Sequence, residues 1–215
     1  MNSHFPARNE TRKLMFVSRE RIFTFLVWGA WVGLAFLCIY PTTNWLAGFR
    51  PHHYRLFVMQ ELGVPFVPAF VWAYLSMYVL FLFPPFFLAS EAMQRLAKAL
   101  IRATCVAGVV FLVFPARLGF PRILPDDPLL RSLFATLFAV DPPYNLVPSL
   151  HVAYSTAIVL AIAARVGRKI RILLFSWLAL IMASTLFIHQ HHLLDVFTGW
   201  ALALLVHRYE RRKHA

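Results

Sequence analysis

Charged residues are scarce in this sequence. Only 14% of its 215 residues are Asp, Glu, Lys or Arg, against about 25% in a typical soluble domain. The sequence instead contains long apolar runs, and several of them approach the length of roughly 20 residues that a helix needs to cross a bilayer. The scarcity of charge excludes an ordinary soluble domain and predicts an all-α, polytopic membrane protein.

Cysteine is scarce as well. Cys38 and Cys105 both fall in apolar runs, and their spacing is not that of a metal site. We expect two small buried hydrophobic side chains, with no disulfide and no metal site at the cysteines. Internal repeats and low-complexity segments are also absent, so we expect a single domain.

Six apolar runs predict a bundle of six transmembrane helices. The runs are 22–40, 64–83, 96–114, 149–165, 171–188 and 192–207. They divide the chain into a basic tail (1–21), one membrane domain (22–207) and a second basic tail (208–215). Prolines are expected to mark helix ends, with Pro41 directly after the first run and Pro84 and Pro85 after the second.

The distribution of basic residues predicts the orientation in the membrane. A formal net charge of +12 is compatible with nucleic-acid binding, but the basic residues flank the spans. Most of them lie on the side of the two termini, in segments 8–21, 95–102, 165–171 and 208–213. The positive-inside rule therefore makes both termini cytoplasmic and favours a bilayer over nucleic acid as the partner.

The outer segments are 41–63, 115–148 and 189–191. Segment 129–140 has apolar residues at helical spacing but is too short to span, so we expect an interfacial helix there. Segment 45–62 has a similar composition and receives the same prediction. Such segments either wall a lipid entry site or anchor aromatic side chains among headgroups. Glu61 either orients another group of the outer segments or is solvated, and we expect it to be solvated.

Two short motifs carry the chemistry. Segment 148–151 (Pro-Ser-Leu-His) opens the fourth span, and segment 191–195 (His-His-Leu-Leu-Asp) opens the sixth. The chain crosses the membrane twice between them, so both motifs should meet at one face. Asp195, four residues after His191, can orient its imidazole and leave the other nitrogen free to attack phosphorus. His151, at a helix start that attracts phosphate, can protonate the leaving group.

A phosphate group also needs donors. Planar guanidinium groups bind it bidentately, and small hydroxyls and backbone N–H groups add further donors. Snorkelling arginines and hydroxyls that bond to nearby backbone are the alternative interpretations. The expected phosphate-binding residues are Arg117, Arg122, Ser149, Leu150, Ser184 and Thr185.

These motifs resemble the second and third signatures of the type 2 phosphatidic acid phosphatase superfamily, and most closely the branch that includes inositol phosphorylceramide synthases. The resemblance covers the chain from about residue 60 onward and implies His191 as nucleophile, Asp195 as its orienting acid, His151 as general acid, and no metal. The sequence departs from the pattern at Leu150, where glycine is usual, and at Thr185, where an arginine is usual. The lysine-containing first signature is missing.

The predicted function is therefore an integral membrane lipid phosphatase that hydrolyses a phosphomonoester or pyrophosphate through a phosphohistidine, with an exoplasmic active site. A lipid phosphotransferase would use the same residues with a different acceptor. Zinc bound by His189, His192 and their neighbours, haem between two histidines, and a non-catalytic transporter component are further alternatives. Transport is disfavoured because the spans are nearly free of polar residues.

Overall fold

The computed structural model describes residues 18–213, and within that range it is built of helices without strands. Most of the predicted basic N-terminal tail, including Arg8, Arg12 and Lys13, therefore lies outside the described residues. The helical elements are α2 (Arg19–Gly48), η1 (Met59–Gly63), η2 (Pro68–Phe70), α3 (Val71–Phe81), α4 (Pro84–Phe87), α5 (Ser90–Val113), α6 (Pro128–Val140), α7 (Leu150–Ala163), α8 (Arg168–Phe187) and α9 (Leu193–Lys213).

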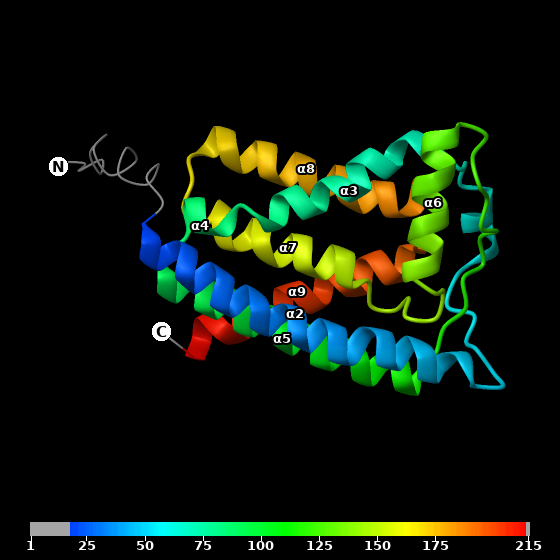
Figure 1. Cartoon of the computed structure of the whole chain (residues 1–215), viewed down its shortest axis with the longest axis horizontal. Coiled ribbons are helices and arrows are strands. Elements are labelled where there is room, and N and C mark those ends of the chain that lie inside the picture. The colour runs from blue at the N-terminus through cyan, green and yellow to red at the C-terminus, as the bar shows by residue number, and fades with distance from the viewer. Residues whose placement is uncertain (1–17, 214–215) are drawn as a thin grey trace.

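The longer helices run along one axis and alternate in direction, whereas α6 lies across one end of the bundle (Figure 1). The start of α2, the start of α5, the α7–α8 turn and the end of α9 gather at the opposite end. The starts of α7 and α9 and the end of α8 lie at the end that α6 covers. The described parts of the predicted basic segments and the predicted site motifs thus occupy opposite ends of the molecule.

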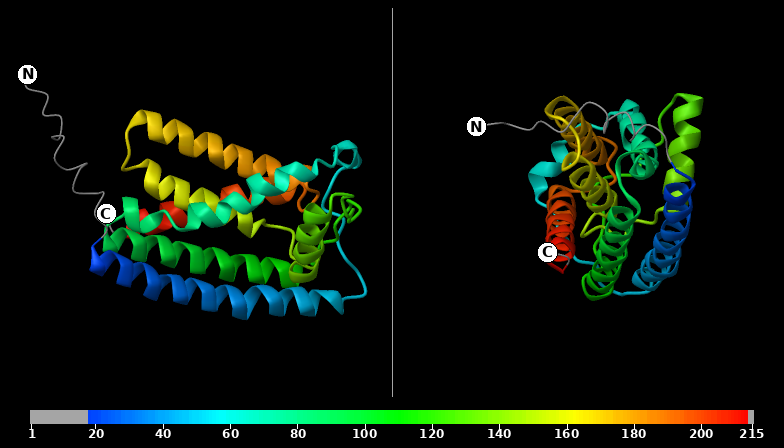
Figure 2. Two further views of the ribbon diagram at one scale, coloured as in Figure 1. Left: turned by 45° about the horizontal axis from the view of Figure 1, so that its top comes forward. Right: turned by 90° about the vertical axis from the view of Figure 1, so that its left-hand side faces the viewer.

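Helix α7 is the centre of the bundle (Figure 2). Nearly all of its side chains are buried, because it packs against α3, α5, α8 and α9. An apolar helix that is buried on every side needs no polar face.

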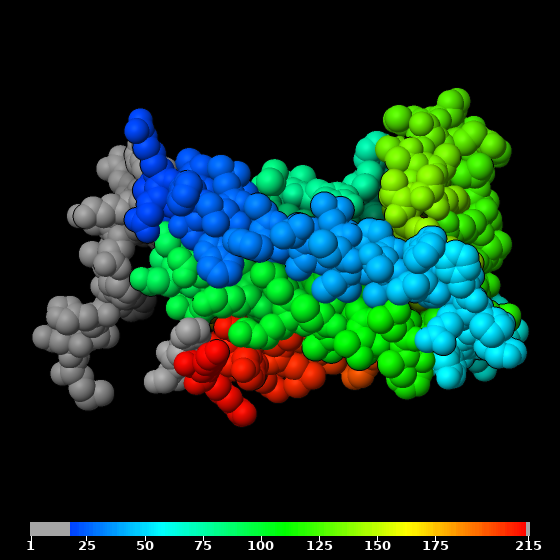
Figure 3. Space-filling view, turned by 60° about the horizontal axis from the view of Figure 1, so that its bottom comes forward, coloured from blue at the N-terminus to red at the C-terminus, as the bar shows by residue number. Residues whose placement is uncertain are grey.

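Helix α2 is peripheral and lies along α5 on the face shown in Figure 3. Large apolar side chains such as Phe23, Leu26 and Leu37 point outward from it. By length and composition α2, α5 and α8 can each cross a membrane. The prediction of an all-helical chain with membrane-crossing helices is confirmed at this level.

The prediction that the first helix ends at Pro41 is wrong. Helix α2 continues through Pro41 to Gly48. The Tyr40 carbonyl oxygen, directly before the proline, accepts hydrogen bonds from the Thr43 hydroxyl (3.1 Å) and the Asn145 amide (2.7 Å). Proline removes the N–H that would donate to the carbonyl of residue 37, and these two side-chain hydrogen bonds add support to the helix at the neighbouring residue Tyr40.

The prediction of a helix in segment 45–62 is also wrong. After α2 ends, the chain is irregular and partly extended, with a parallel bridge between Tyr54 and Ala116, until η1 begins at Met59. A segment rich in aromatic and basic residues can form either a helix or an extended strand. Here the chain around Tyr54 is extended, because it pairs with segment 115–117 of the other outer loop. The helix expected at 129–140 is confirmed as α6, which Asp127 caps by accepting from the Leu130 N–H (2.9 Å).

Candidate active site

The N-terminal ends of α7 and α9 touch. Ser149 caps α7 by accepting a hydrogen bond from the Val152 N–H (3.4 Å), and its own N–H donates to the Asp195 carbonyl oxygen (3.0 Å). Gly199 permits this approach, because a Cβ there would overlap the Ser149 carbonyl group. The two motifs, forty residues apart in sequence, are brought together by this helix contact.

We expect Gly199→Ala to destabilise the protein. The added methyl group would meet backbone that cannot rotate away, and such overpacking costs about 1–3 kcal/mol. Thermal unfolding of the purified chain in detergent measures the change. Gly33→Ala in α2 is the matched control, since nothing lies within 4 Å of its Cβ position. An unchanged melting temperature for Gly199→Ala would contradict the close helix contact.

The turn between α8 and α9 fixes the position of His191. The backbone N–H groups of Gln190 and His191 both donate to the Thr185 carbonyl oxygen (3.0 and 3.1 Å). His189 reverses the chain with a left-handed φ of 58°, and its Nε2–H donates to the Val64 carbonyl oxygen (2.9 Å). Helix α9 begins only at Leu193, so His191 lies before the helix and not in its first turn.

Four side chains form one continuous row of hydrogen bonds. The Tyr74 hydroxyl lies 2.7 Å from His151 Nε2, His151 Nδ1 lies 3.1 Å from His191 Nε2, and His191 Nδ1 lies 3.1 Å from Asp195 Oδ2. Tyr74, His191 and Asp195 are 0%, 2% and 1% exposed, respectively. The three predicted catalytic residues therefore meet, and Tyr74 joins them.

The direction of each hydrogen bond in this row follows from its carboxylate end. An ionised Asp195 only accepts, so His191 donates from Nδ1, and a neutral His191 then has its lone pair on Nε2. His151 must then donate from Nδ1 to that lone pair, which leaves its own Nε2 to accept from the Tyr74 hydroxyl. With both imidazoles neutral, these directions satisfy every group in the row and point the His191 Nε2 lone pair at His151.

Tyr74 was not predicted from the sequence. It lies in the apolar run 64–83, which also contains Tyr78, and no motif distinguishes the two tyrosines. Only the packing of α3 against α7 shows which hydroxyl reaches His151.

A second cluster links η1, the outer loop and α9. Glu61 Oε2 accepts from the His192 Nδ1–H (3.2 Å) and the Leu193 N–H (2.8 Å), and the Gly119 N–H donates to His192 Nε2 (3.0 Å). The prediction that Glu61 is solvated is wrong: it is 7% exposed, because these donors satisfy its carboxylate.

The same cluster shows how His192 is used. Its ring is stacked between Phe57 and Phe120. Burial lowers the pKa of His192, and the Asp195 and Glu61 carboxylates offset part of that effect. Both ring nitrogens have protein partners, so the neutral side chain ties the loop to α9. Among residues 18–213, no group of three or more His, Cys, Asp or Glu side chains is arranged to hold a metal ion.

Arg122 and Gln190 lie beside His191 in a narrow crevice that Tyr40 and Asp141 also line. The Arg122 guanidinium donates to the carbonyl oxygens of Phe138 (2.8 Å) and Asp141 (2.5 Å). Its Nε and the Gln190 Nε2 are buried without a hydrogen-bond partner in the described part of the chain. Two unused donors therefore adjoin the predicted nucleophile, and Gln190 is a second residue that sequence reasoning missed.

Asp141 adds a carboxyl group to this crevice. Burial raises the pKa of Asp141, whereas the hydrogen bond from the Tyr40 hydroxyl (2.5 Å) and the nearby His191 and Arg122 oppose that shift. Partial burial likewise lowers the pKa of Arg122, and Asp141 opposes it. The crevice thus combines a fixed cation with a carboxyl group that burial makes harder to ionise.

The other predicted phosphate-binding residues are placed differently. Arg117 is exposed and does not line the crevice; its backbone pairs with Tyr54. The Ser184 and Thr185 hydroxyls are buried and donate to carbonyl oxygens one turn earlier in α8 (2.6 and 2.8 Å). Ser149 serves as the α7 cap. Of the predicted residues with phosphate-binding side chains, Arg122 alone lines the crevice beside His191.

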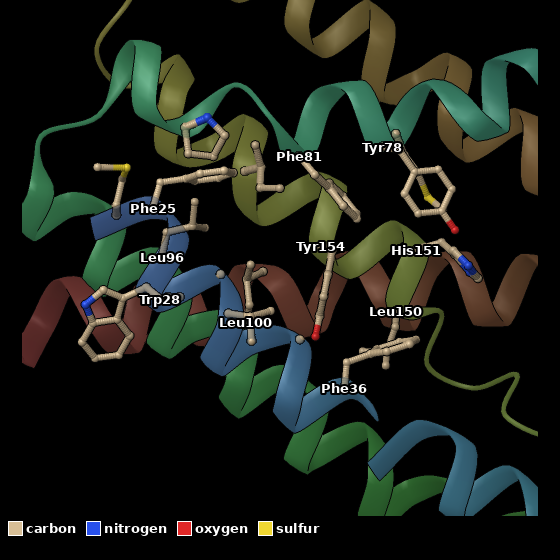
Figure 4. Close-up of a pocket in the computed structure, with 18 of the residues that line it drawn as sticks. Phe25, Trp28, Phe36, Tyr78, Phe81, Leu96, Leu100, Leu150, His151 and Tyr154 are labelled. Atoms are coloured by element: carbon tan, nitrogen blue, oxygen red, sulfur yellow. The ribbon is translucent and has the colours of Figure 1, made fainter. Parts of the chain in front are cut away.

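A long apolar cavity leads to His151. It has a volume of about 470 Å³ and lies between α2, α3, α5 and α7. Figure 4 shows His151, Leu150 and Tyr78 at one end and Phe25 and Trp28 at the other. The cavity extends along much of α2, so a long apolar ligand in it would place its polar end near His151.

Comparisons with protein-family models, with curated proteins and with solved structures found no match to this chain.

Proposed function

We propose that this protein is an integral membrane lipid phosphatase of the type 2 phosphatidic acid phosphatase superfamily, acting through a phosphohistidine at His191. The buried row of Tyr74, His151, His191 and Asp195 is the observation that carries the proposal. In this row one nitrogen of His191 donates to a carboxylate, and the other nitrogen has a lone pair and contacts a second histidine. Phosphoryl transfer through a histidine requires these three parts: a nucleophile, a group that orients it and a general acid.

The proposal includes six spans, formed by α2, α3, α5, α7, α8 and α9. Their alternating directions and the gathering of basic helix ends opposite the site support this count (Figure 1). The positive-inside rule then makes both termini cytoplasmic and the site exoplasmic. In that orientation α6 lies in the plane of the outer interface, as its transverse position in the bundle favours.

In the first chemical step the phosphoryl group of the substrate enters between the two imidazoles. His191 Nε2 forms a bond to phosphorus while the bond from phosphorus to the lipid oxygen breaks. As the anionic phosphoryl group binds, His151 takes up a proton at Nε2 and donates it as a hydrogen bond to the Tyr74 oxygen. The resulting imidazolium gives its Nδ1 proton to the lipid oxygen and returns to the neutral form. Asp195 stabilises the positive charge that His191 gains, at a hydrogen-bond distance of 3.1 Å.

In the second step water replaces the lipid. The water oxygen attacks phosphorus as His151 Nδ1 accepts its proton, and the phosphorus–nitrogen bond breaks to regenerate neutral His191. Arg122 Nε and Gln190 Nε2, the two unused donors of the crevice, are placed to bind the phosphoryl oxygens. If a hydroxyl-bearing lipid replaced water, the same residues would perform a phosphotransfer.

The apolar cavity favours a lipid substrate. From Phe25 to Tyr40 its α2 wall covers sixteen residues, and the fifteen steps between them rise about 22 Å along the helix. That length is comparable to most of a bilayer's hydrocarbon core, about 30 Å. A hydrocarbon chain in this cavity would hold its phosphate at the level of His151.

A phosphate-release screen tests the proposal. The purified full-length chain is assayed in detergent with phosphatidate, phosphatidylglycerophosphate and polyprenyl pyrophosphate, beside His191→Ala and the exposed control His52→Ala. We expect release from at least one lipid by wild type and His52→Ala, but not by His191→Ala. A phosphorylated lipid product without free phosphate would identify a transferase. Equal release by His191→Ala would refute the mechanism.

Tyr74→Phe is expected to lower kcat about tenfold with little change in KM. The substitution removes the hydroxyl that positions His151, and one such hydrogen bond is worth roughly 1–1.5 kcal/mol. Steady-state kinetics on the lipid found in the screen measure both constants. Tyr54→Phe is the control, because Tyr54 is exposed and does not line the cavity, and it should behave as wild type. A raised KM with unchanged kcat would show that Tyr74 contacts substrate instead.

A further inference from the structure

A second polar cavity lies at the end of the bundle opposite the proposed active site. It has a volume of about 440 Å³ and is bounded by α5, α9 and the α7–α8 turn. Arg95 contributes from α5, Arg165 from the turn and Arg211 from α9. Figure 1 shows these three segments together, far from the starts of α7 and α9.

Small side chains create the space between the arginines. Ala92 and Ala99 of α5 and Ala161 and Ala164 of the α7 end line the cavity. Arg95 is half-buried, whereas Arg165 and Arg211 are exposed at the opening. An anion can therefore enter from outside and reach guanidinium groups from three separate elements.

The cavity carries an excess of positive charge. Partial burial and the nearby charges of Arg95 and Arg211 lower the pKa of Arg165. The acidic residue of the lining, Glu210, forms an ion pair with Arg102, which does not line the cavity. Arg165 donates to the Ala161 carbonyl oxygen (2.7 Å) through Nη1. The guanidinium has further N–H groups that can donate to a bound anion. A bound anion would offset the repulsion among the three cations.

We propose that this cavity, lined by Arg95, Arg165 and Arg211, is a binding site for a phosphate group, separate from the proposed active site. Guanidinium groups bind phosphate oxygens in bidentate geometry, and three of them offer more donors than the two oxygens of a carboxylate can accept. The volume leaves room for the rest of a headgroup. The phosphate belongs either to an anionic lipid of the adjoining leaflet or to a free anion from the aqueous phase.

Thermal unfolding of the full-length chain distinguishes the two sources. In one arm the protein in detergent is titrated with inorganic phosphate; in the other, nanodiscs of phosphatidylcholine alone are compared with nanodiscs containing phosphatidylglycerol. A ligand of the folded state raises the melting temperature in a saturable way. Arg95→Gln and the exposed Arg211→Gln are compared with Arg212→Gln, an exposed neighbour that does not line the cavity.

We expect saturable stabilisation of wild type and Arg212→Gln, with the apparent affinity of Arg95→Gln and Arg211→Gln weakened on the order of tenfold. Stabilisation by inorganic phosphate identifies a free anion, and stabilisation by phosphatidylglycerol alone identifies a headgroup. If Arg95→Gln fails to fold, Arg211→Gln decides the result. An equal response of Arg211→Gln and Arg212→Gln, or no response of wild type in either arm, would overturn the proposal. Binding and not turnover is measured, so the result does not depend on the proposed enzyme activity.

Discussion

Replacing His191 with alanine is expected to reduce turnover of the lipid phosphate by at least a thousandfold. The substitution removes the only group in the row that presents a bare nitrogen lone pair to His151. Without a nucleophile, the remaining groups orient and polarise the substrate but form no covalent intermediate. His191 is 2% exposed, so replacing it leaves the charge on the protein surface nearly unchanged. The expected loss of turnover is therefore attributed to the missing nucleophile.

The covalent intermediate supplies a more specific measurement than turnover. A lipid substrate labelled with ³²P at the transferable phosphoryl group should label wild-type protein, and the label should survive alkali but not acid, as a phosphorus–nitrogen bond requires. His191→Ala should take up no label. Labelling that persists in His191→Ala, or that survives acid, would place the covalent bond on another residue.

His151→Ala separates the two histidine roles. His191 and its carboxylate partner remain in this variant, so slow labelling by a substrate with a good leaving group is compatible with the mechanism. Loss of labelling only with poor leaving groups would indicate that His151 protonates the departing oxygen. This comparison uses the contact between the rings, 3.1 Å from nitrogen to nitrogen, as its structural basis.

The helices were largely predictable from the sequence because each apolar run is long and bounded by polar segments. The prediction failed at Pro41, because proline usually ends a helix. The Asn145 amide, which donates to the Tyr40 carbonyl oxygen, lies more than a hundred residues later, and the local sequence contains no information about that contact. Segment 45–62 failed for a related reason. Its pairing partner, Ala116, lies in another loop, and local composition contains no information about it.

The site was predictable where spacing and membrane crossing determine it. The fourth and sixth spans must start at the same end if the chain crosses twice between them, and this brought His151 and His191 together. Tyr74 and Glu61 were not predictable, because each acts through a contact with a distant segment. Gln190 was not predictable because the crevice that it lines is formed by residues from distant segments, including Tyr40, Arg122 and Asp141. Hydroxyls also misled: Ser184 and Thr185 occupy promising positions in the sequence, but each bonds to its own helix, as such residues commonly do.

Asp195→Asn is expected to lower kcat on the order of 10²–10³-fold while leaving the fold intact. One oxygen, Oδ2, accepts both from His191 Nδ1 (3.1 Å) and from the His192 N–H (2.9 Å). An asparagine carbonyl in that place keeps both hydrogen bonds and the His191 tautomer. The substitution therefore removes the charge alone, and a pair of unit charges about 4 Å apart is worth roughly 4 kcal/mol at an effective dielectric constant of about 20.

Asp195→Ala is the matched comparison, because it removes the charge and the acceptor together. The His192 N–H, buried at this position, would lose its partner, and an unsatisfied buried donor costs about 1–3 kcal/mol. We expect a lower melting temperature for Asp195→Ala than for Asp195→Asn, and a larger loss of kcat, since His191 is then free to adopt the other tautomer. Equal activity of wild type and Asp195→Asn would show that the carboxylate orients the imidazole without stabilising a cationic phosphohistidine.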